Sequence, residues 1–129
     1  MESKFHESFY SFTKYYDIAF DFRDIPKECS FLKELYLKHS NRPLSSFIEF
    51  GAGPALHCVE LAKDLPLVTA VDLSQEMTDY AKSKAAKANV FVNCEYADMI
   101  TYESQRTYDM AALLMDSTSY LLTNAHVIE

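Results

Sequence analysis

No apolar run in this 129-residue sequence is long enough to cross a bilayer, and residues 1–9 lack the apolar centre of a signal peptide. We therefore expect a cytoplasmic protein with no membrane association. Positive charge is also scarce, since 12 Lys and Arg stand against 19 Asp and Glu, and the basic residues form no cluster. The formal net charge of −7 argues against a nucleic acid partner, because binding the phosphate backbone needs clustered positive charge.

Cysteine and histidine are few and scattered. Cys29, Cys58 and Cys94 form no C-x-x-C pair, so the sequence predicts neither a disulfide framework nor a zinc site but three buried, reduced thiols. The histidines show no metal-ligand spacing, and we assign no metal. His57 is expected to be a packing residue rather than a general base.

Two helical patterns open the chain. Aromatic residues at helical spacing predict a first helix from about Phe5 to Ala19, and a second helix opens near Pro26, a residue suited to a first helical turn. The inward stripe of this second helix is predicted to be Cys29, Leu32, Leu35, Tyr36 and His39. Residues 1–42 are thus expected to form a helical preface to a core at residues 43–129, the two making a single domain.

Short apolar runs alternate with helical patterns in the core. The runs predict strands at 47–50, 67–71, 90–96 and 110–115. Pro54 is expected to open the helix after the first strand, and Ser74 to cap the helix after the second. This order predicts a Rossmann-like, doubly wound parallel α/β sheet, in which right-handed crossovers give the strand order 3-2-1-4.

Both glycines of the sequence lie in one stretch, Glu49-Phe50-Gly51-Ala52-Gly53-Pro54-Ala55. Glycines after a strand let the backbone turn sharply and approach a ligand closely, although two of them fit a turn that binds nothing equally well. Asp72 ends the next predicted strand, about 20 residues further on, the spacing at which a carboxylate meets a ribose. The combination predicts a ligand that contains a nucleoside.

The nucleoside ligand is not expected to carry a pyrophosphate. Leu56 stands where a dinucleotide fingerprint needs its third glycine, and neither glycine begins a G-x-x-x-x-G-K phosphate loop.

The same stretches resemble class I S-adenosylmethionine-dependent methyltransferases. Residues 49–57 resemble the first motif of that family, written E-x-G-x-G-P-x-x-H in one branch, with Ala55 in place of the common third glycine. Residues 71–77 resemble its second motif, and residues 97–99 its adenine-contacting turn. Residues 108–115, followed by Asp116-Ser117, are similar to its fourth strand.

The preface is similar to that of small-molecule N-methyltransferases, including enzymes that act on amino sugars. The residues concerned are Tyr15-Tyr16-Asp17 and Arg23-Asp24. Tyr16 and Arg23 could close over the methionine carboxylate of the cofactor, although an aromatic stripe is usually core and a single Arg is usually solvated.

The resemblance implies a full set of contacts to S-adenosylmethionine. Gly51 and Gly53 would pass beneath the methionine portion, Glu49 would support their loop, and Asp72 would accept hydrogen bonds from the ribose hydroxyls. The remaining implied contacts are those of Ala52 and Met77, of Leu73, Asp98 and Met99 around the adenine, and of the Leu114 or Met115 backbone to the ammonium group.

The predicted function is therefore methyl transfer to a small-molecule acceptor through N or O. Alignment in a dry site does most of this work, so a dedicated base is optional. Asp116 is a weak candidate for orienting the acceptor, with helix capping as the alternative. The other functions left open are a cofactor-binding or interaction module without turnover and another Rossmann nucleotide-binding protein.

A further helix is expected to begin near Asn124, soon after the fourth strand. Members of the family continue beyond this point with further strands, which the 129-residue sequence does not contain. The run at 110–115 is apolar on both faces, which suits a central strand, yet its outer edge would have no neighbour. We therefore predict either a fragment of a longer gene product or self-association through this edge.

Overall fold

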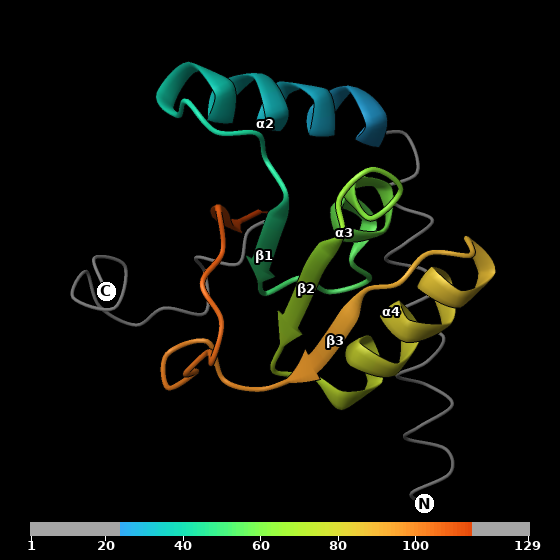
Figure 1. Ribbon diagram of the computed structural model, residues 1–129. Coiled ribbons are helices and arrows are strands. Elements are labelled where there is room, and N and C mark those ends of the chain that lie inside the picture. The colour runs from blue at the N-terminus through green and yellow to red at the C-terminus, as the bar shows by residue number, and fades with distance from the viewer. Residues whose placement is uncertain (1–23, 115–129) are drawn as a thin grey trace, which may run out of the picture.

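A four-stranded parallel sheet in the order β3-β2-β1-β4 lies at the centre of the computed structural model, which describes residues 24–114 (Figure 1). The strands are β1 (Ser46–Phe50), β2 (Leu67–Asp72), β3 (Asn93–Tyr96) and β4 (Met110–Leu113). The predicted Rossmann-like fold and strand order are confirmed. The predicted first helix and the helix near Asn124 lie outside the described residues.

Among residues 24–114, three helices accompany the sheet: α2 (Ile25–His39), α3 (Leu56–Leu61) and α4 (Gln75–Lys87). Asp24 caps α2 by accepting a hydrogen bond from the Lys27 amide at 3.1 Å, and Ser74 caps α4 as predicted, accepting from the Met77 amide at 3.2 Å. Within residues 24–114 no helix has the length and apolar character needed to cross a membrane.

Helices α3 and α4 cover the same face of the sheet, because both belong to right-handed crossovers that step in the same direction across it (Figure 1). The buried core forms between this face and the two helices. Its main members are Phe47, Val68, Ala70, Cys58, Leu61, Ala81 and Ala85. This packing fixes where the strands end, and so where the loops at their carboxyl ends meet.

The opposite face of the sheet is crossed by the connection between β3 and β4. The Tyr102 ring packs edge-on against Phe50 with centroids 5.7 Å apart, and its hydroxyl donates a hydrogen bond to Glu95. Further along, the hydroxyls of Tyr108 and Thr69 are hydrogen-bonded at 2.6 Å. Phe50 and Glu95 share this face because both lie in register with Val71 of β2.

Asp109 joins the amino ends of β1 and β4. Its Oδ2 accepts hydrogen bonds from the Ser45 amide and hydroxyl, both at 2.9 Å, and from the Ser46 amide at 3.1 Å. The Asp109 amide in turn donates to the Ser46 hydroxyl at 2.8 Å. These bonds lower the pKa of the Asp109 carboxyl, with the bond from the Ser45 amide as the main cause.

The predicted stripe of α2 is wrong at two positions. Cys29, Leu32 and Tyr36 are buried, but Leu35 is 39% exposed and His39 is exposed. Figure 1 shows α2 lying across the amino end of the sheet, next to α3. Within residues 24–114, α3 is the helix that packs against α2. A single helix covers only a narrow stripe of another helix's surface, so the positions on either side of that stripe stay outside the core.

Several predicted element boundaries also differ from the structure by one to three residues, and two of the differences have a clear cause. Helix α3 begins at Leu56 rather than at Pro54, because Ala55 is left-handed, with φ 60° and ψ 41°, and its amide closes a turn onto the Ala52 carbonyl at 2.9 Å. Strand β3 begins at Asn93 rather than at residue 90, because Asn89 is left-handed and the Val90 amide still donates to a carbonyl of α4.

Candidate cofactor-binding site

The glycine stretch and the end of β2 meet at the carboxyl edge of the sheet. The Ala52 amide donates to the Val71 carbonyl at 3.1 Å, and the Gly53 amide donates to Asp72 Oδ2 at 2.8 Å. In open α/β sheets, ligands bind in the crevice outside the carboxyl ends of the strands. The structure therefore brings the predicted loop and the predicted carboxylate together where a ligand is expected.

Every second residue of this loop is left-handed. Gly51 has φ 64°, Gly53 has φ 56° and Ala55 has φ 60°. A Cβ built on Gly53 would have no atom within 4 Å, so the loop faces open space at this position. A ligand can thus approach the Gly53 backbone closely.

Asp72 connects three segments of this edge. Its Oδ2 accepts from the Gly53 amide, its Oδ1 accepts from the Ser74 amide at 2.9 Å, and its carbonyl accepts from the Ala97 amide at 2.9 Å. A carboxylate offers about four acceptor positions. The two backbone bonds therefore orient the group and leave positions for further donors such as ribose hydroxyls.

The predicted adenine contacts lie on the next two loops. Leu73 is 58% exposed, so its side chain is available to a ligand. Ala97 ties the following turn to Asp72, and within that turn Asp98 Oδ1 accepts from the Ile100 amide at 2.9 Å. Met99 is half-buried in the same turn, and Met77 is buried in the first turn of α4.

Glu49 lies behind the glycine loop and is completely buried. The Cys58 thiol of α3 donates to Glu49 Oε1 at 3.3 Å. Burial, followed by the charge of Glu49, raises the pKa of Cys58 well above its usual range, and burial raises that of Cys29 to about 12. Both thiols therefore stay protonated; they and the half-buried Cys94 are free.

His57 is a packing residue, as predicted. Its side chain is 1% exposed, and its Nε2 lies 2.9 Å from Glu28 Oε1. No group of three or more His, Cys, Asp or Glu side chains in residues 24–114 is placed to hold a metal ion.

Four predicted site residues lie outside the described residues: Tyr16, Arg23, Met115 and the acceptor-orienting candidate Asp116. Leu114, the last described residue, is half-buried. The structure therefore describes the loop, ribose and adenine parts of the predicted site.

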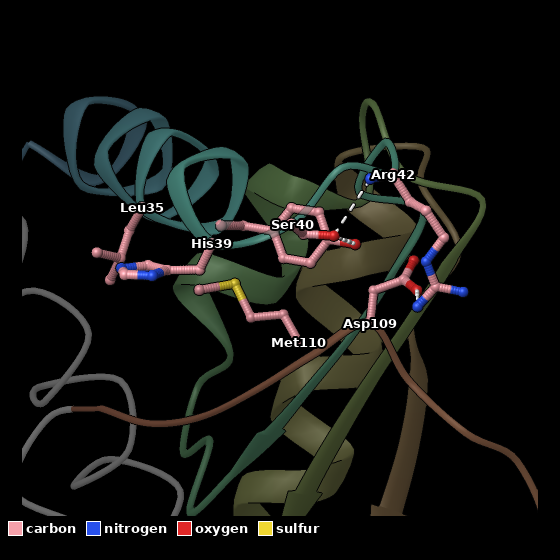
Figure 2. A pocket seen from close by; sticks show the side chains of 7 residues that line it. Leu35, His39, Ser40, Arg42, Asp109 and Met110 are labelled. Atoms are coloured by element: carbon pink, nitrogen blue, oxygen red, sulfur yellow. Dashed lines mark hydrogen bonds and ion pairs between the residues drawn. The ribbon is translucent and has the colours of Figure 1, made fainter.

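A pocket of about 390 Å³ opens elsewhere, at the amino end of the sheet (Figure 2). It lies between the last turns of α2 and the start of β4, where Asp109 and Met110 line it. Leu35 and His39, the two residues wrongly predicted to be core, line this pocket. Because it lies at the opposite end of the strands from Gly53 and Asp72, it is not part of the predicted site.

Three features of the site escaped the sequence analysis: the left-handed Ala55, the bond from the Gly53 amide to Asp72, and the contact between Glu28 and His57. A signal existed only for Ala55, which stands where similar sequences have a glycine. The other two are hydrogen bonds between residues 19 and 29 positions apart. Spacing placed Asp72 near the glycine loop, but it specifies neither the bond from the Gly53 amide nor the pairing of His57 with Glu28.

A family model described as "Methyltransferase domain" matches residues 47–127, more than half of the chain. A relative from Geobacillus sp. (strain WCH70), named "Putative methyltransferase", is 28% identical over 117 residues, which cover 91% of this chain and 47% of the relative. The chain thus spans about half the length of this curated relative.

Solved structures show the same fold at low identity. An S-adenosylmethionine-dependent methyltransferase from Clostridium acetobutylicum ATCC 824 matches with a TM-score of 0.79 at 21% identity, covering 91% of this chain and 49% of that one. An amino pentose methyltransferase from Micromonospora echinaspora, with S-adenosylmethionine bound, matches with a TM-score of 0.74 at 19% identity. The match covers 86% of this chain and 46% of that one. A sugar N-methyltransferase from Streptoalloteichus sp. ATCC 53650 matches with a TM-score of 0.73 at 22% identity, covering 87% of this chain and 44% of that one.

Proposed function

This chain belongs to the methyltransferase domain family, and we propose that it is the S-adenosylmethionine-binding half of a methyltransferase acting on a small molecule. The observation that carries the proposal is the arrangement of Asp72 and Gly53. The carboxylate is held against the glycine loop by a 2.8 Å bond, and the loop faces open space beside it. A nucleoside cofactor fits this pair of features, because its ribose hydroxyls can donate to the carboxylate while the rest of the ligand lies close to the loop backbone.

Each part of the cofactor has proposed contacts in the chain. Bound S-adenosylmethionine supplies a methyl group on a sulfonium, which is already an activated leaving group. Gly51, Ala52 and Gly53 run beneath the methionine portion, with Glu49 behind them, and Asp72 accepts from the ribose hydroxyls. The other proposed contacts are Leu73, Asp98 and Met99 around the adenine, and Tyr16, Arg23, Leu114 and Met115 at the methionine end. Met77 is a further proposed cofactor contact.

We further propose an amine or hydroxyl on a small molecule as the acceptor. Two of the similar structures are named as amino pentose and sugar N-methyltransferases, which supports an amine. In this proposal residues 43–129 form the Rossmann-like core and residues 1–42 the preface that closes over the cofactor, while Asp116 orients the acceptor.

Calorimetric titration of the chain with S-adenosylmethionine tests the proposal, with NADH as the comparison ligand. Saturable binding of S-adenosylmethionine but not of NADH is expected. Asp72→Ala should weaken binding by roughly ten- to a hundredfold, the effect of losing a hydrogen bond to a charged acceptor.

Asp79→Ala is the matched control. It removes the same charge from an exposed position of α4, where Asp79 accepts a bond from Gln75 at 2.9 Å, and should bind as the unmodified chain does. Equal losses in the two variants, or tight NADH binding, would contradict the proposal. Binding without methyl transfer to any amine or hydroxyl acceptor would instead favour a module without turnover.

A further inference from the structure

His57 is a buried titratable residue that the proposed chemistry does not use. An ionised carboxylate only accepts hydrogen bonds, so His57 Nε2–H donates to Glu28 Oε1 across the 2.9 Å contact. In the described part of the chain, no hydrogen-bond partner accompanies the buried Nδ1. The bond to Glu28 is thus the contact that orients this ring.

Two consecutive residues of α2 contact His57. Besides the bond from the ring to Glu28, the Cys29 thiol donates to the His57 carbonyl at 3.7 Å. Cys29 is 2% exposed, whereas the Glu28 side chain is 34% exposed. Helix α2 therefore contacts both the side chain and the backbone of one residue in α3.

His57 is the second residue of α3, two positions after the left-handed Ala55 that ends the glycine loop. Ala55 occupies the N-cap position and makes no side-chain capping bond. The first turn of α3 therefore lacks the local stabilisation that a Ser, Thr, Asp or Asn would give. Two kinds of contact hold this turn instead: Cys58 donates to Glu49 of β1, and Glu28 and Cys29 of α2 contact His57.

We propose that Glu28 is a positioning residue for the cofactor: acting through His57, it holds the first turn of α3 and thereby the conformation of residues 53–55. The inference rests on the proposed function, because the loop matters for chemistry only if it binds S-adenosylmethionine. Glu28 itself does not touch the ligand. Its effect reaches the ligand through the backbone of the loop.

A second contact between the same segments provides a matched control. Lys33 of α2 lies 2.5 Å from Asp64, in the turn after α3, and both side chains are substantially exposed. This ion pair also joins α2 to the α3 region, but beyond the carboxyl end of α3 and away from the glycine loop. General weakening of the contact between the helices therefore affects both pairs, whereas of these two pairs only Glu28–His57 lies next to the glycine loop.

Amide hydrogen exchange of the loop tests the proposal without any ligand. The Gly53 amide donates to Asp72 and the Ala55 amide to the Ala52 carbonyl, so both are protected while the loop keeps its conformation. Glu28→Ala should speed exchange at these two amides by about tenfold, the effect of losing one bond to a charged group. Glu28→Gln, whose amide oxygen can still accept from Nε2–H, should restore slow exchange, and Asp64→Ala should leave it unchanged.

Calorimetry then measures the consequence for the cofactor. Glu28→Ala should bind S-adenosylmethionine about tenfold more weakly than the unmodified chain. The affinities of Glu28→Gln and Asp64→Ala should stay close to that of the unmodified chain. Should Glu28→Ala fail to fold, Glu28→Asp, one methylene shorter, is expected to shift loop exchange in the same direction.

Unchanged loop exchange in Glu28→Ala, or equal changes in Glu28→Ala and Asp64→Ala, would overturn the positioning role. If the unmodified chain binds no S-adenosylmethionine, the proposed function fails, and the exchange rates still decide whether Glu28 holds the loop.

Discussion

Asp72 combines two tasks in one side chain. Its carboxylate holds the glycine loop through the Gly53 amide and the turn before α4 through the Ser74 amide. The same group is the proposed acceptor for the ribose. Pre-orientation by backbone donors reduces the freedom that the side chain loses when a ligand binds, which favours tight binding. The residue proposed to recognise the ligand is thus also the residue that shapes the glycine loop.

Gly53 and Ala55 provide a prediction about the loop backbone. Gly53→Ala should destabilise the fold by about 1 to 2 kcal/mol, because the position is left-handed, with φ 56°. Its new methyl group would enter the open space before the loop, so S-adenosylmethionine binding should fall at least about tenfold, a loss of about 1.4 kcal/mol. Chemical denaturation and calorimetry measure the two effects.

Ala55→Gly is the control for this prediction. It relieves a left-handed alanine at φ 60° but removes a completely buried methyl group worth about 0.8 kcal/mol. Stability should therefore change by less than about 1 kcal/mol, the difference of these opposing effects, and binding should not change. A Gly53→Ala variant that binds normally would show that the ligand does not lie against this loop.

Among the elements, the connection between β3 and β4 is held by its tyrosines on the sheet face opposite α3 and α4. Burial, followed by the hydrogen bond to Glu95, raises the pKa of Tyr102 to about 12 from the ordinary value of 10.0. A raised folded-state pKa means that the hydroxyl's contribution to stability is complete below pH 10 and is lost as the pH rises towards 12.

Tyr102→Phe tests this alkaline dependence. The variant should be less stable than the unmodified chain at neutral pH, since the bond to Glu95 is lost. It should also lose less stability as the pH is raised above 10, because no hydroxyl remains to ionise at this position. Denaturant unfolding across this range measures both effects; identical pH profiles would mean that Tyr102 ionises as freely as an exposed tyrosine.

Asp109 gives the corresponding prediction at the acid end. Its pKa is lowered by the amide and hydroxyl of Ser45, so its contribution is present above the ordinary value of 3.8 and is lost as the pH falls through the lower folded-state value. Asp109→Asn, which cannot ionise, should show a smaller loss of stability below pH 3.8 than the unmodified chain. Thermal unfolding at stepwise lower pH checks this, and Asp79→Asn is a control without the strand contacts.

At the scale of the whole molecule, the sheet is unevenly covered. Within residues 24–114, β4 pairs with β1 alone. Ala111 is exposed and Leu113 is 39% exposed on the same strand. A strand edge with exposed apolar side chains favours pairing with another chain.

For this edge the sequence predicts either a longer gene product or self-association, and we propose that the 129-residue chain on its own self-associates through β4. Sedimentation velocity should show a dimer whose fraction rises with concentration, and Leu113→Lys should shift it to the monomer, because lysine on an edge strand opposes pairing. Phe91→Lys is a control at a residue that is 75% exposed but lies before β3. A monomer at all concentrations would exclude this use of the edge.

The order of the elements and the place of the candidate site follow from the amino-acid sequence alone. Alternating apolar runs and helical patterns, with right-handed crossovers, predict the strand order 3-2-1-4 that the structure has. The glycine stretch and Asp72 are predicted at the ends of adjacent strands, and in the structure Gly53 and Asp72 are hydrogen-bonded at 2.8 Å. Such features follow from local periodicity and chain connectivity, which are written directly in the spacing of residues.

Which side chains meet depends on the packing of the folded chain. It left Leu35 and His39 outside the core, brought Tyr102 onto Glu95, and paired His57 with Glu28 from another helix. These outcomes depend on how far each neighbouring element reaches across a face. The area that each neighbour covers is set by packing between segments distant in sequence, so it cannot be predicted from a local sequence pattern.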